Sequence, residues 1–338
     1  MNPDWKAFLI EQDALINSSD SSNSSYSPEI KVLADLSGRG LLKVSGEDAE
    51  SFLQNQLTND IRNVNETTHQ ESAWCSPKGR IIANFRIFKR ADSFLLDLSA
   101  DLLEHVIKKL RMYVMMSKVT IEDVSESMVH FSYSGQGADT ELKEILGDVP
   151  QSTSESLQFD SLTILAIAGP NPRFDIFGEV DDCMSLWQKL SNNAVIATSS
   201  HWDYLNVQAG IPMISAESSE AWIPQMVNYI QIGGVDFQKG CYPGQEVVAR
   251  LNYLGKTKRR MYHIETDASS ALKVGSPVKS ANDTEAGKVL SSVLNPEGKA
   301  EALVILKIAE TKKPLSVSVD NQEATLRMLD LPYDIEDE

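Results

Sequence analysis

Apolar residues recur along the chain with two different periods. Within residues 47–57, Ala49, Phe52, Leu53 and Leu57 are spaced by three and four positions, which predicts an amphipathic helix. Short β-branched and aromatic runs bounded by turn residues predict strands. In the first part of the chain we expect strands at 32–36, 40–46, 71–75, 80–88, 93–98, 119–122, 129–133 and 162–168, and helices at 101–113, 139–146 and 181–190. This order predicts an α+β fold with antiparallel pairing rather than a doubly wound parallel sheet.

The pattern changes to alternation beyond Thr257. Glycine, proline and asparagine turns separate short segments of β-branched and aliphatic residues. These expected strands are 260–265, 278–280, 286–290, 301–306 and 315–319. Closely spaced strands of this kind predict a small antiparallel barrel at the C-terminus.

The two ends of the chain differ from the rest in composition. A short helix is expected before residues 17–28, which are nearly all small and polar and predict a mobile linker. The start lacks a basic region followed by an apolar core, so we expect no signal peptide. Residues 334–338 form an acidic tail that we expect to fray.

Composition narrows the classes of function. The 338 residues carry a formal net charge of −17, from 31 basic and 48 acidic side chains. Such a charge repels a polyphosphate backbone unless basic residues cluster, so nonspecific nucleic-acid binding is disfavoured. The three cysteines, Cys75, Cys183 and Cys241, are too sparse for a disulfide framework and suit a reducing cytoplasm. No apolar run approaches the length of a bilayer span, so no membrane is expected.

One cysteine lies in an unusual turn, in the segment Lys239-Gly240-Cys241-Tyr242-Pro243-Gly244-Gln245-Glu246. Glycine and proline break regular structure on both sides, and a helix is predicted to start just after the turn. Backbone N–H groups at the helix start and the Lys239 ammonium would favour thiolate over thiol. Cys241 is therefore predicted to be reactive or metal-binding. The structural alternative is a buried small apolar residue.

Other candidate ligands and nucleophiles are less organised. There is no Cys-x-x-Cys pair, and the five histidines, His69, His105, His130, His201 and His263, lack ligand spacing. We therefore predict no autonomous metal site. Cys75 and Cys183 are expected to be structural, in a strand and a helix. His201 or His263 could serve as a base for Cys241, although neither lies in a catalytic motif.

A basic run, Lys256-Thr257-Lys258-Arg259-Arg260, follows the cysteine segment in this otherwise acidic chain. It could receive a polyanionic ligand or an acidic partner, and we expect it to be exposed. The alternative is a solvated loop between domains.

The cysteine segment matches the K-G-C-Y-x-G-Q-E motif of the YgfZ family of bacterial proteins, which are relatives of the folate-dependent aminomethyltransferase (T-protein) of the glycine cleavage system. The resemblance covers nearly everything after the serine-rich linker. Its further segments are Gln54-Asn55-Gln56-Leu57-Thr58-Asn59-Asp60, Cys75-Ser76-Pro77-Lys78-Gly79-Arg80, Ser117-Lys118-Val119-Thr120-Ile121 and Gln208-Ala209-Gly210-Ile211-Pro212.

The resemblance implies a T-protein-like three-part ring around a folate site. The implied domains are a folate-binding body of two subdomains at 29–255 and a C-terminal β-barrel at 256–333, flanked by the N-terminal segment 1–28 and the tail 334–338. Trp202 matches a folate-associated tryptophan, and Arg39 stands where the family has another. Gln208 replaces the glutamate that hydrogen-bonds the pterin in aminomethyltransferases. These three are the expected residues for binding tetrahydrofolate or its polyglutamates.

The resemblance also implies a cytoplasmic folate-binding accessory protein that supports the assembly or repair of iron–sulfur enzymes, including tRNA-modifying ones. Cys241 would be its reactive thiol, assisted by Lys239, and its partners would be iron–sulfur enzymes or assembly proteins. A folate-dependent aminomethyl or one-carbon transferase is the alternative, and Gln208 argues against it. A tRNA-binding module is a second alternative, but the net charge disfavours direct tRNA binding.

Overall fold

The computed structural model describes residues 1–12, 14, 26–115, 117–320 and 322–335. Most of the expected serine-rich linker and the last residues of the acidic tail lie outside this range. The chain forms two compact units. The first unit comprises Met1–Leu53, Ile61–Gln70 and Phe85–Trp202, and the second comprises Gln54–Asp60, Glu71–Asn84 and Asp203–Glu338.

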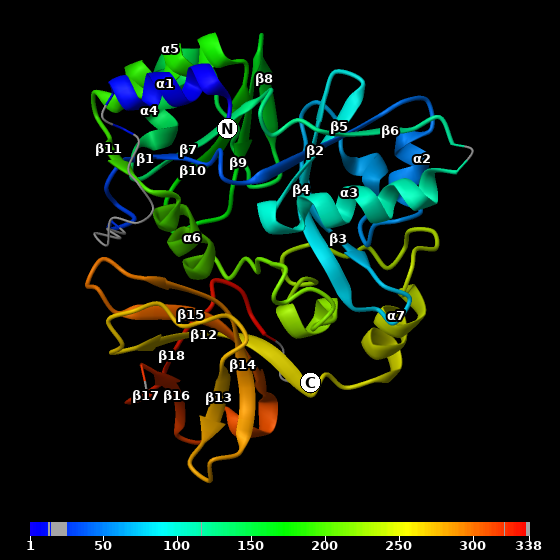
Figure 1. Ribbon diagram of the computed structural model, residues 1–338, viewed down its shortest axis with the longest axis vertical. Coiled ribbons are helices and arrows are strands. Elements are labelled where there is room, and N and C mark those ends of the chain that lie inside the picture. The colour runs from blue at the N-terminus through cyan, green and yellow to red at the C-terminus, as the bar shows by residue number, and fades with distance from the viewer. Residues whose placement is uncertain (13, 15–25, 116, 321, 336–338) are drawn as a thin grey trace. The chain divides into compact units, whose positions relative to one another are not determined.

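A six-stranded sheet forms the centre of the first unit. Its order is β11 (Val195–Ala197), β1 (Val32–Asp35), β7 (Val129–Ser134), β10 (Arg173–Gly178), β9 (Leu162–Ala166) and β8 (Ser156–Phe159). The pair of β1 and β11 is parallel, and the remaining neighbours are antiparallel. Helices α1 (Pro3–Glu11), α4 (Ala138–Leu146) and α5 (Val180–Ser191) lie against it (Figure 1). Trp5 of α1 stacks on Phe131 and meets Trp187 edge-on in the shared core.

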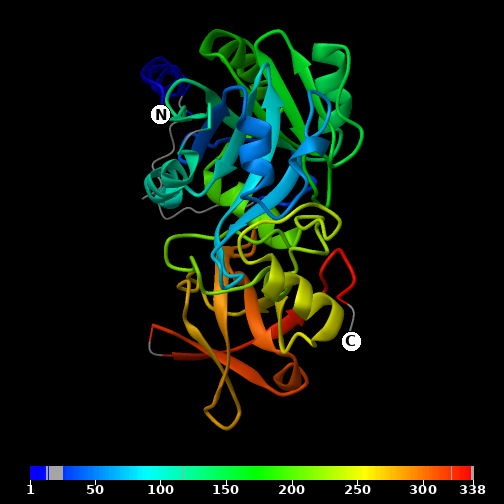
Figure 2. The same ribbon diagram turned by 90° about the vertical axis from the view of Figure 1, so that its right-hand side faces the viewer.

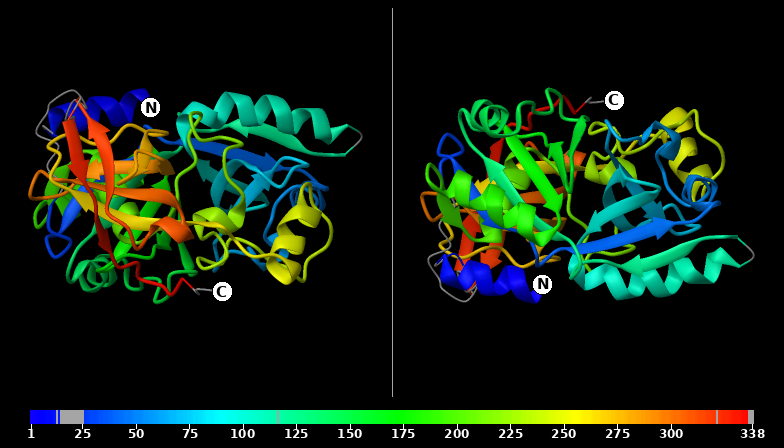
Figure 3. Two further views of the ribbon diagram at one scale, coloured as in Figure 1. Left: turned by 90° about the horizontal axis from the view of Figure 1, so that it is seen from below. Right: turned by 90° about the horizontal axis from the view of Figure 1, so that it is seen from above.

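The second sheet has the order β3 (Gln70–Cys75), β4 (Ile81–Arg90), β5 (Ser93–Leu98), β2 (Gly40–Ser45) and β6 (Thr120–Asp123). Helix α3 (Ala100–Val114) packs along β2 and β6 (Figure 3). Its apolar stripe, Leu102, Leu103, Val106 and Leu110, is buried. Helix α2 (Ala49–Gln54) is shorter than predicted, because the chain leaves helical geometry before Leu57. The turn between β1 and β2 connects two different sheets.

The C-terminal sheet has seven strands that curl into a half-barrel (Figure 2). Its core contains aliphatic side chains such as Ile264, Val289 and Val304. The order is β17 (Gln322–Thr325), β16 (Leu315–Val319), β13 (Pro277–Ser280), β14 (Glu285–Leu294), β15 (Ala300–Lys307), β12 (Arg259–Thr266) and β18 (Arg327–Leu329). The remaining elements are α6 (Ser199–Gln208), α7 (Gln245–Leu254) and the 3-10 helices η1 (Ile61–Asn63), η2 (Pro224–Val227) and η3 (Ile308–Glu310).

The predicted fold class is confirmed: helices accompany mainly antiparallel sheets, and a curled β-sheet ends the chain. The expected hairpin at 71–88 is present as β3 and β4. Strand β10 was missed, because Arg173 and Asp175 read as surface residues although both are buried. Asp175 pairs with Arg86 at 2.5 Å, which compensates the buried charge. No helix in the described ranges has the length and apolar character to cross a bilayer.

Candidate functional site

The Cys241 thiol lies exposed in the turn that precedes α7. The structure describes all three cysteines, and the other two, Cys75 and Cys183, are buried. Burial raises the pKa of both buried thiols to about 12, so they remain protonated at neutral pH. Cys241 is therefore the cysteine that an outside reagent or partner can reach.

Lys239 is buried at the start of this turn, with an exposed fraction of 5%. Its ammonium donates to the carbonyl oxygens of Gln54, Leu57 and Asn59, at 2.8, 2.5 and 2.9 Å. Three carbonyls match the three donors of an ammonium group. The segment Gln54–Asp60 is thereby attached to the cysteine turn. Sequence reasoning placed the Lys239 charge next to the thiol, whereas the structure directs it to this carbonyl cage.

Gly244 caps the N-terminus of α7 with a left-handed conformation, φ 81°. A Cβ atom here would lie 2.4 Å from the Ser76 carbonyl oxygen and 2.7 Å from the Gly79 Cα. The position therefore needs glycine twice, for its backbone angle and for this close approach. Gly240 is different, because nothing lies within 4 Å of the Cβ it would carry.

The turn Ser76–Gly79 forms the other side of this contact. The Gly79 amide donates to the Ser76 carbonyl at 2.8 Å, and Gly79 also has a positive φ of 70°. A Cβ on Gly79 would lie 3.0 Å from Cβ of Val247 in α7. The cysteine turn, residues 239–246, thus meets two segments that are distant in sequence, namely Gln54–Asp60 and the β3–β4 turn.

Tyr242 is buried beneath the turn, with an exposed fraction of 6%. Its ring lies 5.4 Å from the Lys239 Nζ. Burial raises the pKa of the Tyr242 hydroxyl, and Cys75 and Asp236 raise it further. Within the described residues this hydroxyl has no hydrogen-bond partner. Gln245 reaches back to the carbonyls of Lys239 and Gly240 at 3.5 Å, and Glu246 is exposed.

Arg39, one of the expected folate residues, is engaged by this chain. Its Nε and Nη2 donate to the two carboxylate oxygens of Asp97 at 2.7 and 2.8 Å. Asp97 is 1% exposed. Burial acts to lower the pKa of Arg39, but the Asp97 carboxylate outweighs it and raises that pKa. A bidentate pair of this kind already uses the planar fork that would grip a ligand carboxylate.

Trp202, in α6, is 1% exposed, and the Arg173 guanidinium lies 3.7 Å from its ring centroid. One face of the indole is therefore covered by a cation of the same unit. A pterin that stacked on that face would have to displace Arg173.

Gln208 ends α6 and donates to the Glu301 carboxylate of β15. Glu301 is buried and also contacts His263 Nε2 at 2.9 Å and Asn295 Nδ2 at 3.0 Å. Burial acts to raise the pKa of Glu301, but these three hydrogen-bond partners outweigh it and hold the pKa below its usual value. Sequence reasoning missed this cluster, because Glu301 lies in an ordinary apolar strand pattern with no motif around it.

The two candidate bases for Cys241 are both buried. His263 contacts the Glu301 carboxylate. Burial, and to a smaller extent the positive charge of Arg173, lowers the pKa of His201 to about 4. Among the described residues no group of three histidine, cysteine or acidic side chains is arranged to hold a metal ion.

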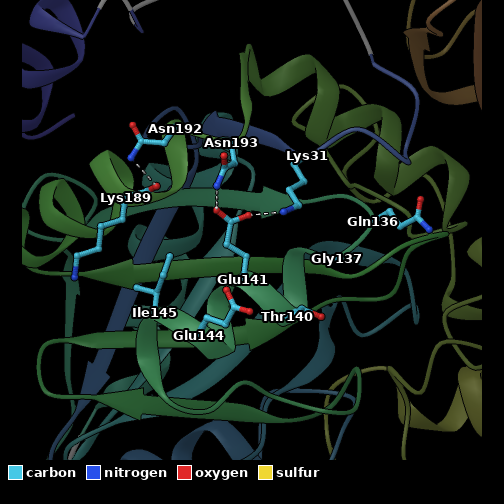
Figure 4. A pocket seen from close by; sticks show the side chains of 10 residues that line it. All are labelled: Lys31, Gln136, Gly137, Thr140, Glu141, Glu144, Ile145, Lys189, Asn192 and Asn193. Carbon is cyan, nitrogen blue, oxygen red and sulfur yellow. Dashed lines mark hydrogen bonds and ion pairs between the residues drawn. The ribbon is translucent and has the colours of Figure 1, made fainter.

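A polar pocket of about 580 Å³ lies in the first unit beside α4 (Figure 4). At its centre Glu141 accepts from Lys31 at 2.5 Å and Asn193 at 2.9 Å, and from the Tyr133 hydroxyl at 2.7 Å. Burial acts to raise the pKa of Glu141, and these partners lower it below its usual value. The carboxylate is thus already satisfied by its own unit.

The chain is similar to known proteins in its sequence and in its fold. Residues 29–173 match the GCVT N-terminal domain. The fold is similar to that of the glycine cleavage system aminomethyltransferase T from Bartonella henselae, with a TM-score of 0.71 over 90% of this chain and 86% of that one. At 14% identity this likeness shows the fold alone.

Two curated relatives are named tRNA-modifying protein YgfZ. The protein of Klebsiella pneumoniae (strain 342) is 31% identical over 310 residues, which cover 90% of this chain and 94% of the relative. The protein of Enterobacter sp. (strain 638) is 30% identical over 309 residues, with the same two coverages. Since this identity extends over nearly the full length of both chains, the chain belongs to the YgfZ family of tRNA-modifying proteins.

Proposed function

We propose that this protein is an accessory factor for the assembly or repair of iron–sulfur enzymes, including tRNA-modifying ones, and that Cys241 is its reactive residue. The observation that carries the proposal is the exposed Cys241 thiol in a turn fixed by buried Lys239 and by Gly244, while Cys75 and Cys183 are buried. The relatives' name connects the family with tRNA modification.

The chemistry available to Cys241 is that of a single accessible sulfur. After losing its proton to solvent, the thiolate can bond to one iron of a cluster. Biological clusters are held by several such ligands, so the others must come from a partner. The cluster is accordingly treated as cargo, exposed at the surface of a client enzyme. Rigid support from the carbonyl cage around Lys239 would keep the sulfur in one position.

Tetrahydrofolate or its polyglutamates are proposed as a bound ligand on the family resemblance. In this structure Arg39, Trp202 and Gln208 each contact groups of this chain, so a ligand at these side chains would have to displace those contacts. We therefore derive no chemical step through folate. Calorimetric titration of the protein with tetrahydrofolate tests binding, and unchanged affinity in Trp202→Ala, which removes the aromatic ring, would move the ligand elsewhere.

The function itself is tested by complementation. In a bacterial strain that lacks its own YgfZ protein, the level of a tRNA modification made by an iron–sulfur enzyme is measured after expression of each variant. Cys241→Ser should lose activity. Gly240→Ala is the matched control, because it changes the neighbouring residue where nothing lies within 4 Å. Full modification with Cys241→Ser would contradict the proposed role.

Aminomethyl transfer is the second candidate, favoured by the fold of the Bartonella henselae enzyme. Here position 208 carries an amide, which does not ionise, and this amide donates a hydrogen bond to Glu301. Incubation with tetrahydrofolate and an aminomethyl-loaded lipoyl carrier should therefore yield no methylene-tetrahydrofolate. Its formation at a rate that depends on this protein would support the transferase instead.

A further inference from the structure

Helix α7 has apolar side chains on two faces. Val248 is buried and holds the helix in its unit. Val247, Leu251 and Leu254 are spaced by four and three positions and so lie along another face. Leu254 is 85% exposed and Val247 40% exposed. A helix with one stripe in the core does not need a second apolar stripe in water for its own stability.

This second stripe forms the wall of a groove of about 630 Å³. Ile223 and Met226, at η2, contribute further apolar surface. The segment 255–259, which leads into β12, completes the lining. All of these residues belong to the second unit.

The groove has a basic rim. Arg250, Lys256, Lys258 and Arg259 line it, and Glu246 is the acidic side chain among the lining residues. Lys256 and Lys258 are exposed. The expected exposure of the basic run was wrong for Arg260, which lies in β12 at a buried position and is 7% exposed. Four cations around an apolar floor stand out in a chain of net charge −17.

We propose that this groove docks an acidic segment of a partner protein that carries aliphatic side chains. The apolar floor requires apolar groups, which a polyglutamate or an RNA backbone does not supply. The basic rim complements carboxylates and would speed their encounter in spite of the overall negative charge. Helix α7 has ten residues and is thus about 15 Å long, so a docked segment lies within about one such helix length of the Cys241 turn.

The inference goes beyond the proposed function, because docking in the groove does not need the thiol. The test uses a fluorescein-labelled synthetic peptide with leucines at helical spacing and glutamates between them, added to the full-length protein. Binding is followed by fluorescence anisotropy. Peptides with lysine for glutamate, or serine for leucine, should bind at least about tenfold more weakly.

Two pairs of variants locate the peptide. Leu254→Ser should weaken binding about tenfold, whereas Tyr253→Ser should not, since Tyr253 is also exposed but does not line the groove. The double change Lys256→Glu and Lys258→Glu should weaken binding in a salt-dependent way. Lys273→Glu with Lys312→Glu changes the net charge equally at exposed positions of the same unit outside the groove and should have little effect.

Three results would overturn the inference. One is equal peptide affinity in Leu254→Ser and Tyr253→Ser. Another is tighter binding of a single-stranded RNA oligonucleotide than of the acidic peptide, which would make the rim a nucleic-acid surface. The third is a concentration-dependent dimer in sedimentation that Leu254→Ser abolishes, which would make a second copy the occupant. Cys241→Ser should bind the peptide normally, so that loss of tRNA modification in that variant tests the thiol separately from the groove.

Discussion

At the residue scale, accessibility separates the three cysteines. Iodoacetamide at neutral pH should alkylate Cys241 and spare Cys75 and Cys183, because the latter are buried and the pKa of each is raised to about 12. Mass spectrometry of tryptic peptides gives the labelling of each thiol. Denatured protein, in which all three should react, serves as the control. Labelling of Cys75 at the rate of Cys241 in native protein would contradict the structure.

Tyr242 presents a different test at the same scale. Its buried hydroxyl has no hydrogen-bond partner among the residues that the structure describes. Replacing it with phenylalanine removes a desolvated polar group, so the free energy of unfolding should stay the same or rise by about 1 kcal/mol. Urea denaturation measures this. If activity in complementation falls while stability is kept, the hydroxyl contributes to the site; a loss of several kcal/mol would mean that it has a partner.

At the scale of elements, the cysteine turn is held by long-range contacts rather than by its own helix. Lys239→Met would leave the carbonyls of Gln54, Leu57 and Asn59 without their donor. Hydrogen bonds to charged groups contribute about 1.5–3 kcal/mol, so the variant should lose about 3 kcal/mol of unfolding free energy. Lys78→Met is the control, since Lys78 is exposed in the neighbouring turn. Equal stability of the two variants would show that the cage is unimportant.

The contact between α6 and β15 has a defined pH dependence. Because its folded pKa is held below the ordinary value of 4.5, Glu301 contributes stability that is fully present above about pH 4.5 and is lost as pH falls through the folded pKa. Gln208→Glu would place a second carboxylate against Glu301 and should cost about 1–3 kcal/mol at neutral pH. Repulsion between the two carboxylates raises the pKa of one of them, which then takes up a proton as pH falls. The difference in unfolding free energy between Gln208→Glu and wild type should therefore shrink at lower pH.

The control for this experiment is Gln208→Met, which removes the hydrogen bond without adding a charge. Because methionine does not titrate, the unfolding free energy that Gln208→Met loses relative to wild type should depend on pH less than the loss in Gln208→Glu, from neutral to mildly acidic pH. Thermal unfolding followed across this pH range measures both variants. A Gln208→Glu difference that is independent of pH would contradict the proximity of the two side chains.

At the scale of the whole molecule, the net charge of −17 acts on every partner. Although the family is named for tRNA modification, such a charge should keep bulk tRNA from binding at physiological salt. A gel-shift titration with unfractionated tRNA should show no complex there. A shift at this ionic strength that Lys256→Glu with Lys258→Glu abolishes would support direct RNA binding, contrary to our expectation.

The division into two units also belongs to this scale. It assigns β3 from Glu71 onward, the start of β4 up to Asn84 and the cysteine turn to the same unit, because the segments Gln54–Asp60 and Glu71–Asn84 join the C-terminal part of the chain. A unit assembled from distant segments is not visible as a composition change along the sequence. The boundary expected near residue 255 remains a prediction.

The sequence by itself determined those elements whose signals are local. Apolar spacing predicted α3 and α4, and turn residues predicted the β3–β4 hairpin and the start of α7 after Gly244. Alternation predicted five strands of the C-terminal sheet, β12 to β16, but not the short strands β17 and β18. These signals work because helix and strand periods are properties of neighbouring residues. The motif around Cys241 likewise marked the turn and the family before any contact was known.

Only the tertiary structure decided which groups these elements bring together. Lys239 could be predicted to assist the thiol, yet its ammonium meets carbonyls of Gln54, Leu57 and Asn59, and Gln208 meets Glu301. Such partners lie far apart in sequence, and a polar side chain carries no local sign of the group it will meet. The pairing is set when distant apolar segments bury one another, since each polar group enclosed in that process must then find a partner within reach.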